Sequence, residues 1–489
     1  MIRAVRPKAE LLSRALIEKI VDEAFLLLGR HGVFVENAEA RRLFREAGMP
    51  ADETSFKVLI NRKLIEESLE ATPLTVTLFD RSGTEEYVVG HDEVHFDPGS
   101  AAVRLLDHST QDARLPLTAD LIRLARVTEH CANLHFQSTA LIASEVSKII
   151  ADSYRLFIGL QYCSKPVVTG LFRTGGFRPM AEMLAAVRGG TEELRRKPLA
   201  VFDACPSPPL KWSDLTAQSL IDCARAGIPS QLISMGLTGA TSPVTLAGTL
   251  VQHVAENLAG LVICQMARRG APVIFGGSPA AFDMRKGTTP MGAIETMMID
   301  MAYAQIGKHL KLPTHAYMGL SDAKVNDSQA GLETGMGAVL AALAGINVVS
   351  GAGMLDFEST QSLEKLLIDN EICGMAYRLV GGISQRDEPL ALRLFESLGP
   401  DGQFLSLPHT RQWYKAEYAL TSLADRETYD AWVGQGRTSM AERAHDRLER
   451  LLAGPAPLLV EPGLQRELRR IMESDAEANG AGALPGAAG

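Results

Sequence analysis

The spacing of hydrophobic residues changes near residue 125. Before that point, apolar residues recur at helical intervals over residues 8–29, and a second helix is predicted over 62–70. The segments TVTLFD and EEYVVG flank a turn at Gly83, which predicts a β-hairpin. We therefore expect residues 1–125 to form an N-terminal extension of helices and a hairpin.

From about residue 130, short apolar runs alternate with long helical runs. Seven candidate strands are visible, and they are ANLHFQST, PVVTGLF, PLAVFDA, IPSQLISMG, APVIFGG, LPTHAYMG and INVVSGAG. Strands that alternate with helices indicate a parallel sheet. An eighth strand, placed at GQFLSL (402–407), would close a TIM (β/α)8 barrel over 126–455. A doubly wound α/β sheet is the alternative, but no GxGxxG motif opens a helix here.

The remaining segment, 456–489, is expected to hold a C-terminal helix and a disordered tail. After about residue 474 the sequence becomes rich in alanine and glycine. Such composition offers little apolar surface to bury, so it favours disorder.

Composition and charge exclude several classes of protein. The formal net charge is −9 and no basic face is visible, which argues against nucleic-acid binding. No run of 18 apolar residues and no signal-peptide pattern occurs, so we expect a cytoplasmic protein without a membrane span. The 6 cysteines are scattered without a CxxC pair, and His130 and His135 do not form a convincing ligand set. We therefore expect no metal site.

Barrels keep their chemistry at the carboxyl ends of the strands. Here the candidate strands end near Met235, Gly277, Gly319 and Gly351, and each is followed by a polar, glycine-rich loop. The loop 319–333 supplies the candidate catalytic residues, which are Asp322, Lys324, Gln329 and Glu333. Carboxylates gathered at one rim can manage protons or face a cation. Asp327 is expected to cap the next helix instead, and Asp322 can also be interpreted as a turn residue.

The same strand ends carry candidate substrate-binding residues. An aromatic box with a nearby carboxylate is a physical solution for binding a quaternary ammonium group. Core packing explains most of these aromatic residues equally well. Tyr317 is the best aromatic candidate because it lies at a strand end, and Arg285 could hold a substrate carboxylate. The full candidate set is Tyr317, Phe282, Phe357, Arg285, Asp356 and His315, with Glu358 as a further carboxylate of the last loop.

Long motifs at these loops resemble a known family. The stretch GLSDAKVNDSQAGLETGMGAVLAALAGINVVSGAGMLDF resembles the trimethylamine methyltransferase family, as do TSPVTLAGTLVQHVAENLAGLVICQ, SLEKLLIDNEICGM and HTRQWYKAEYALTSLADRETYDAW. The resemblance extends over about residues 10–452. It implies a TIM barrel with an N-terminal extension, and transfer of a methyl group from a methylamine to the cobalt of a separate corrinoid protein.

The resemblance also implies a substrate class. The archaeal trimethylamine enzymes of this family carry a pyrrolysine, whereas this chain consists of the twenty standard residues. Members without pyrrolysine resemble glycine betaine methyltransferases, so a quaternary amine such as a betaine is the expected substrate, with a tertiary methylamine next. The chain lacks the DxHxxG signature of a corrinoid-binding domain, so the cofactor is expected to arrive on a partner protein. A homo-oligomer is also expected.

Two other functions stay open. The first is a zinc-dependent barrel methyltransferase, which would need cysteine and histidine ligands converging at the rim. The second is a non-catalytic protein that binds quaternary amines. No HExxH, GxSxG or GxxxxGK[ST] motif points to a further enzyme class.

Overall fold

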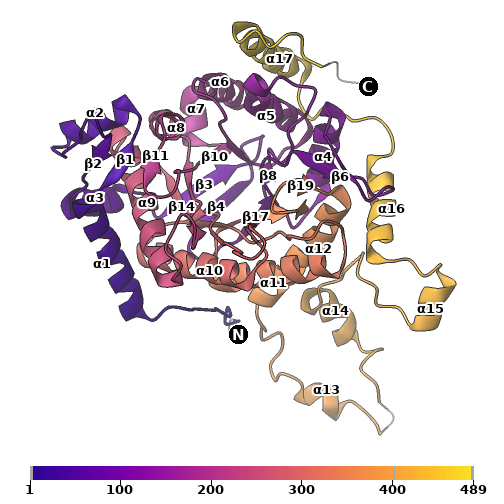
Figure 1. Cartoon of the computed structure of the whole chain (residues 1–489). Coiled ribbons are helices and arrows are strands. Elements are labelled where there is room, and N and C mark those ends of the chain that lie inside the picture. The colour runs from indigo at the N-terminus through magenta and orange to yellow at the C-terminus, as the bar shows by residue number, and fades with distance from the viewer. Residues whose placement is uncertain (1–3, 401, 486–489) are drawn as a thin grey trace.

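The computed structural model describes residues 4–400 and 402–485, and its centre is a ring of eight parallel strands (Figure 1). The strands are β5 (His95–Pro98), β8 (Gln137–Ser138), β9 (Val167–Gly170), β10 (Ala200–Ala204), β12 (Ser230–Ser234), β14 (Val273–Gly277), β16 (Thr314–Tyr317) and β17 (Val348–Ala352). Their order in the sheet is β5-β17-β16-β14-β12-β10-β9-β8. The ring closes where the Phe136 N–H donates to the Phe96 carbonyl at 3.4 Å. The predicted TIM-type barrel is therefore confirmed.

The strand that completes the ring is not the one predicted. The segment 402–407 forms turns in the structure, and the eighth strand is β5, inside the predicted extension 1–125. Residues His95–Pro98 are too short an apolar run to stand out in the sequence. Moreover, the crossover after β5 first forms a hairpin of β6 (Arg104–Leu106) and β7 (Ala113–Arg114) before α4 (Thr118–His130). The boundary at residue 125 therefore falls inside the barrel.

Helices surround the ring on its outer side (Figure 1). They are α5 (Ala151–Tyr162), α6 (Phe177–Arg188), α7 (Thr191–Arg196), α8 (Asp214–Ala226), α9 (Leu246–Ala267), α10 (Ile294–His309), α11 (Ser328–Ala344) and α12 (Leu363–Val380), with a 3-10 turn at Lys148–Ile150. Asp327 caps α11, as predicted, by accepting from the N–H groups of Gln329 and Ala330. Short strands also pair among the loops. β13 (Leu237–Thr238) pairs with β15 (Ala280–Ala281), and β18 (Met354–Leu355) and β19 (Thr360–Gln361) join β6 and β7 in a four-stranded sheet of order β18-β19-β6-β7.

The N-terminal helices cover one flank of the barrel. The elements are α1 (Arg14–Arg30), β1 (Val33–Val35), α2 (Ala38–Glu46), β2 (Lys57–Val58) and α3 (Arg62–Ala71), with β11 (Lys211–Trp212) beside β1. The three helices pack on α9. By length and composition α9 could cross a membrane, but 78% of its apolar window is buried inside the fold. Its hydrophobic surface is therefore occupied by its neighbours.

The predicted hairpin, β3 (Thr75–Phe79) with β4 (Glu86–Gly90), closes the amino end of the barrel. Its side chains share one buried cluster with inward-facing strand residues, and the members are Val76, Leu78, Val89, Phe136, Val168, Val201, Ile274 and Val348. Side chains on a strand alternate between faces with a period of two residues. The inward positions two residues further along are therefore Ser138, Gly170, Asp203, Gly276 and Ser350. The opposite end of the barrel interior is thus polar.

After α12 the chain leaves the barrel as an arm (Figure 1). It contains α13 (Leu392–Glu396), α14 (Pro408–Glu417) and α15 (Tyr429–Gly434), and none of these helices has a buried residue. The chain then returns as α16 (Met440–Leu452) and α17 (Pro462–Ala478).

The predicted C-terminal helix is present as α17. It continues to Ala478 and so includes residues after 474 that were predicted to be disordered. Asp475 explains the extension, because it is buried and accepts from the hydroxyl of Ser153 at 2.6 Å and from Arg173. The end of the predicted tail, 486–489, lies outside the described residues.

Candidate active site at the barrel mouth

Three carboxyl groups from three segments face the polar end of the barrel. Asp97 lies at the end of β5, Asp203 lies in β10, and Glu358 lies in the loop after β17. Asp97 accepts from the Ser350 hydroxyl at 2.8 Å. Within residues 4–400 and 402–485, one oxygen of Asp97 and one of Glu358 are buried without a hydrogen-bond partner. Buried acceptors normally have partners, so these two oxygens mark a place where a ligand can bind.

The mutual proximity of these groups changes their acidity. Burial raises the pKa of Asp97 well above its usual range, and the charges of Asp203 and Glu358 raise it further. Burial raises the pKa of Asp203 to about 7, although hydrogen bonds from Tyr317 and Gln231 oppose this. Burial raises the pKa of Glu358 to about 8, with a contribution from the Asp203 charge. The three carboxyl groups cannot all be ionised near pH 7 unless a cation lies among them.

A strained turn presents Glu358 to the mouth. Asp356, Phe357 and Glu358 have φ values of 51°, 54° and 64°, three successive residues in the left-handed region that non-glycine residues rarely adopt. Lys324 holds the turn from outside, because its ammonium group lies 3.1 Å from Asp356 and 3.9 Å from the centre of the Phe357 ring. Such strain persists only where the surroundings enforce it, and it is commonly found at functional sites.

Tyr317 and His315 form the wall beside these acids. The Tyr317 hydroxyl donates to Asp203 at 3.2 Å, and its ring meets the His315 ring edge-on at 4.8 Å. His315 contacts the Ser350 hydroxyl at 3.1 Å, so His315, Ser350 and Asp97 form a chain. Burial lowers the pKa of His315 to about 3, so the imidazole is neutral at physiological pH.

One buried cation stands close to this group of acids. Arg155, from α5, donates to the Thr139 carbonyl and lies 4.4 Å from the centre of the Phe172 ring. Burial lowers the pKa of Arg155 to about 10, while the charges of Asp152, Asp203 and Tyr317 act in the opposite direction. In the part of the chain that the structure describes, its Nε atom has no hydrogen-bond partner. The mouth thus combines three buried carboxyl groups with a nearby guanidinium.

Comparison with known proteins decides the family. The family model described as trimethylamine methyltransferase matches residues 1–478 of the chain. The chain belongs to the trimethylamine methyltransferase family. It is 32% identical over 442 residues to the trimethylamine methyltransferase MttB of Desulfitobacterium hafniense, covering 90% of this chain and 89% of that protein. It is 29% identical over 470 residues to a glycine betaine methyltransferase of the same species, covering 95% and 97%.

A solved structure supports the fold of this family member. The monomethylamine methyltransferase MtmB of Methanosarcina barkeri superposes with a TM-score of 0.51 at 11% sequence identity, covering 91% of this chain and 89% of that one. At that identity the likeness concerns the fold alone.

Three of the predicted catalytic residues of this methyltransferase-family chain, Asp322, Gln329 and Glu333, form a network at the rim, and Lys324 connects it to the turn that carries Glu358 by donating to the Asp322 carbonyl at 2.6 Å and pairing with Asp356. Asp322 accepts from the backbone N–H groups of Met291 and Gly292 at 3.0 and 2.8 Å. Glu333 accepts from the Asp322 N–H at 2.7 Å and from the Gln329 side chain at 2.9 Å. Burial raises the pKa of Asp322 to about 6. These contacts join two neighbouring loops, and a direct role toward substrate stays a prediction.

The predicted substrate-binding residues divide into two groups. Tyr317, His315, Asp356 and Phe357 lie in or beside the set of three acids, as described above. Arg285 lies elsewhere, with a side chain that is 87% exposed and paired with Asp283 at 3.0 Å. Phe282 is half-buried directly after β15.

Sequence reasoning missed Asp97, Asp203 and Arg155. Asp97 belongs to the strand that was too short to recognise, and Arg155 reaches the mouth from a helix outside the ring. Asp203 could have been found, because it follows the inward-facing Val201 by two residues in a predicted strand. A charged residue on the buried face of a strand is a signal for a functional site.

Proposed function

We propose that this protein removes a methyl group from a quaternary amine of the betaine class and passes it to the cobalt of a corrinoid held by a separate protein. The observation that carries the proposal is the set of Asp97, Asp203 and Glu358 around Tyr317 at the barrel mouth. Family membership and the glycine betaine methyltransferase among its relatives support the reaction class. The absence of pyrrolysine from the sequence supports a quaternary rather than a tertiary substrate.

The charge of the site suits a permanently cationic group. A quaternary nitrogen spreads its positive charge over its methyl carbons and cannot donate a hydrogen bond, so it is held by carboxylates and aromatic faces. Asp203 and Glu358, whose pKa values are about 7 and 8, would ionise when such a cation binds. The Tyr317 ring, between His315 and Asp203, supplies the aromatic wall.

Arg155 favours a zwitterion over a simple ammonium ion. A betaine carries a carboxylate as well as the quaternary nitrogen, and arginine binds carboxylates with two parallel hydrogen bonds. The buried Arg155 already interacts electrostatically with Asp203 and Tyr317. A substrate placed between this guanidinium and the acids would therefore be bound at both ends and oriented.

The chain's own residues would position the methyl group. When bound, the corrinoid supplies a nucleophilic cobalt that accepts the methyl carbon. The carbon–nitrogen bond breaks and its electron pair returns to nitrogen, so the amine loses its positive charge. The acids that attracted the cation then hold the neutral amine less strongly, which favours product release. The tertiary amine is more basic than these carboxylic acids, so it would take up a proton from solvent as it leaves.

The proposal is tested with free cob(I)alamin as the methyl acceptor. Loss of the Co(I) absorbance would be followed with glycine betaine, proline betaine, carnitine, choline and trimethylamine, each with and without the protein. We expect protein-dependent methyl transfer from at least one carboxylate-bearing quaternary amine and none from trimethylamine. Transfer from trimethylamine alone would overturn the proposal. A thermal-shift series with the same compounds separates binding from transfer, because a ligand that binds the folded state raises the melting temperature.

A further inference from the structure

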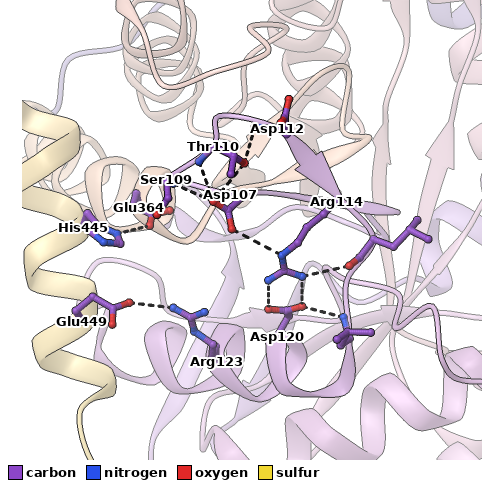
Figure 2. A network of polar contacts seen from close by, with 12 residues as sticks. Asp107, Ser109, Thr110, Asp112, Arg114, Asp120, Arg123, Glu364, His445 and Glu449 are labelled. Carbon is purple, nitrogen blue, oxygen red and sulfur yellow. Dashed lines mark hydrogen bonds and ion pairs between the residues drawn. The ribbon is translucent and has the colours of Figure 1, made fainter.

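A second group of polar side chains lies outside the barrel mouth, where α16 packs on the barrel. His108 is in the turn between β6 and β7, Glu364 is in the first turn of α12, and His445 is in α16. One ligand atom from each lies within 4.8 Å of the others. Figure 2 shows Glu364 and His445 joined across two elements, beside the turn at Asp107. The barrel-mouth acids do not take part in this group.

We propose that His108, Glu364 and His445 bind one divalent transition-metal ion, with zinc as the best match. Two imidazole nitrogens and one carboxylate oxygen are borderline donors of the kind that zinc prefers. Metal–donor bonds of about 2.1 Å in a tetrahedral site place two donors about 3.4 Å apart, so ligand atoms that now lie within 4.8 Å of one another need to approach by up to about 1.4 Å.

The two imidazoles lie side by side, and a rotation of one ring would direct a nitrogen of each toward a shared ion. Their rings are stacked with centres 4.1 Å apart and planes 10° from parallel. The His445 Nδ1 atom is 3.0 Å from Glu364. Among residues 4–400 and 402–485, no hydrogen bond to the ring nitrogens of His108 is observed. A ring nitrogen of His108 is therefore available to a ligand.

Glu364 brings a buried carboxylate to this group. The residue is 5% exposed, and its contacts are His445 at 3.0 Å and the Ser362 hydroxyl at 3.4 Å. A buried carboxylate is stable only when it is paired or coordinates a metal. A divalent ion between the two rings would neutralise it.

Each of the three segments is fixed without the ion, so the donors are preorganised. Asp107 accepts from the N–H groups of Ser109 and Thr110 at 2.9 and 3.0 Å, which makes the turn that carries His108 rigid (Figure 2). A capping box at Ser439 starts α16, and Leu448 of that helix is buried. A preformed donor set pays little ordering entropy when an ion binds.

An adjacent cavity leaves room for a water molecule as the fourth ligand. It has a volume of 310 Å³ and is lined by all three donors together with Asp107, Arg114 and Arg123, among others.

The position of the group suggests a mechanical role. β6 pairs in parallel with β19, two residues beyond Glu358, so an ion that fixes the β6–β7 turn to α12 and α16 would also steady the loop that carries this acid.

This proposal revises the sequence expectation that the chain has no metal site. That expectation considered cysteine pairs and the histidines near residue 130. The three donors proposed here are far apart in the sequence, and only the fold brings them together.

The test measures metal content directly. The untagged full-length protein would be incubated with Zn²⁺, dialysed, and measured by elemental analysis, beside the double variant H108A/H445A and the control variant H409A. His409 is a partly exposed histidine paired with Asp387 at 3.0 Å on the arm. We expect about one zinc per chain in the wild type and in H409A, and a loss of at least tenfold in H108A/H445A.

A spectroscopic measurement guards against a variant that fails to fold. Co²⁺ added to the wild type should give the visible absorption of a nitrogen- and oxygen-bound ion, and the milder variant E364Q should alter that spectrum while its circular dichroism stays unchanged. The proposal is overturned if the wild type retains no zinc above background, or if folded H108A/H445A retains as much as the wild type. Methyl-transfer activity is not part of this readout, so the outcome is independent of the proposed function.

Discussion

The hydroxyl of Tyr317 donates a hydrogen bond of 3.2 Å to Asp203 across the interior of the barrel. Asp203 also accepts from Gln231 at 2.8 Å, so both contacts stabilise its ionised form. Burial acts against them, and the resulting pKa is about 7. This carboxyl group is therefore poised to change its protonation state when a cation enters the mouth.

Replacing Asp203 by asparagine should weaken substrate binding more than it affects the fold. The amide keeps the size and one acceptor of the carboxylate but cannot carry its charge. Hydrogen bonds and contacts to charged groups are worth roughly 1.5–3 kcal/mol, so we expect affinity for a betaine to fall roughly 10- to 100-fold. Isothermal titration calorimetry would measure this. Unchanged affinity in Asp203→Asn would show that the cation binds elsewhere.

Binding of a quaternary amine should release protons at neutral pH. Asp203 and Glu358, with pKa values of about 7 and 8, hold protons in the free protein that an incoming cation expels. Calorimetry at pH 7 in buffers of different ionisation enthalpy should therefore give apparent binding enthalpies that depend on the buffer. The dependence should shrink at pH 9 and in Glu358→Gln. Buffer-independent enthalpies at pH 7 would contradict the assignment.

Two arginines compete for the role of carboxylate anchor. Arg285 is the residue predicted from the sequence, but its side chain is 87% exposed and pairs with Asp283, whereas Arg155 is buried beside Asp203. We expect Arg155→Gln to raise KM for a betaine at least tenfold while changing KM for choline, which has no carboxylate, much less. Arg285→Gln is the matched control and should change neither value. If Arg285→Gln raises KM for the betaine and Arg155→Gln does not, Arg285 is the carboxylate anchor.

The sequence predicted the barrel and seven of its eight strands, for a physical reason. Strands such as INVVSGAG are buried on both faces and are bounded by glycine or proline, so they stand out as apolar runs. β5 does not, because HFDP is short and includes the charged Asp97. The acids of the mouth were harder to predict still, since Asp97, Asp203 and Glu358 converge only once the ring has closed. Loop composition pointed instead to Asp322 and Glu333, which the structure joins to each other and to backbone groups.

Asp322 and Asp327 lie five positions apart and should behave differently when substituted. Asp327 accepts from two N–H groups at the start of α11, so Asp327→Ala should lower stability by roughly 1 kcal/mol and leave methyl transfer mostly intact. Asp322 joins the loop 319–327 to Met291 and Gly292, so Asp322→Ala should shift the rim and reduce transfer, because a displacement of about 1 Å can reduce the rate on the order of 100-fold. Melting temperatures and transfer rates would be compared. Full activity in folded Asp322→Ala would remove this loop from the site.

The acids of the mouth should make the free protein less stable as pH rises. An unfolded aspartate has a pKa near 3.9, whereas Asp203 in the folded protein has a pKa of about 7 and that of Asp97 is well above its usual range. Between pH 4 and pH 7 the folded state therefore binds more protons than the unfolded state at these positions. The contribution of these two groups to the free energy of unfolding is therefore fully present below pH 4, and it is lost as pH rises through 7.

Asparagine at either position removes that residue's share of the decline, because an amide does not titrate. The melting temperature of Asp97→Asn should thus exceed that of the wild type by a margin that grows from pH 5 to pH 8. Saturating betaine should reduce the margin, since the cation stabilises the ionised acids of the wild type. Thermal unfolding at four pH values, with and without ligand, measures both effects. Parallel curves for the wild type and Asp97→Asn would mean that Asp97 has no raised pKa in the folded protein, and that the acids of the mouth do not share a common space.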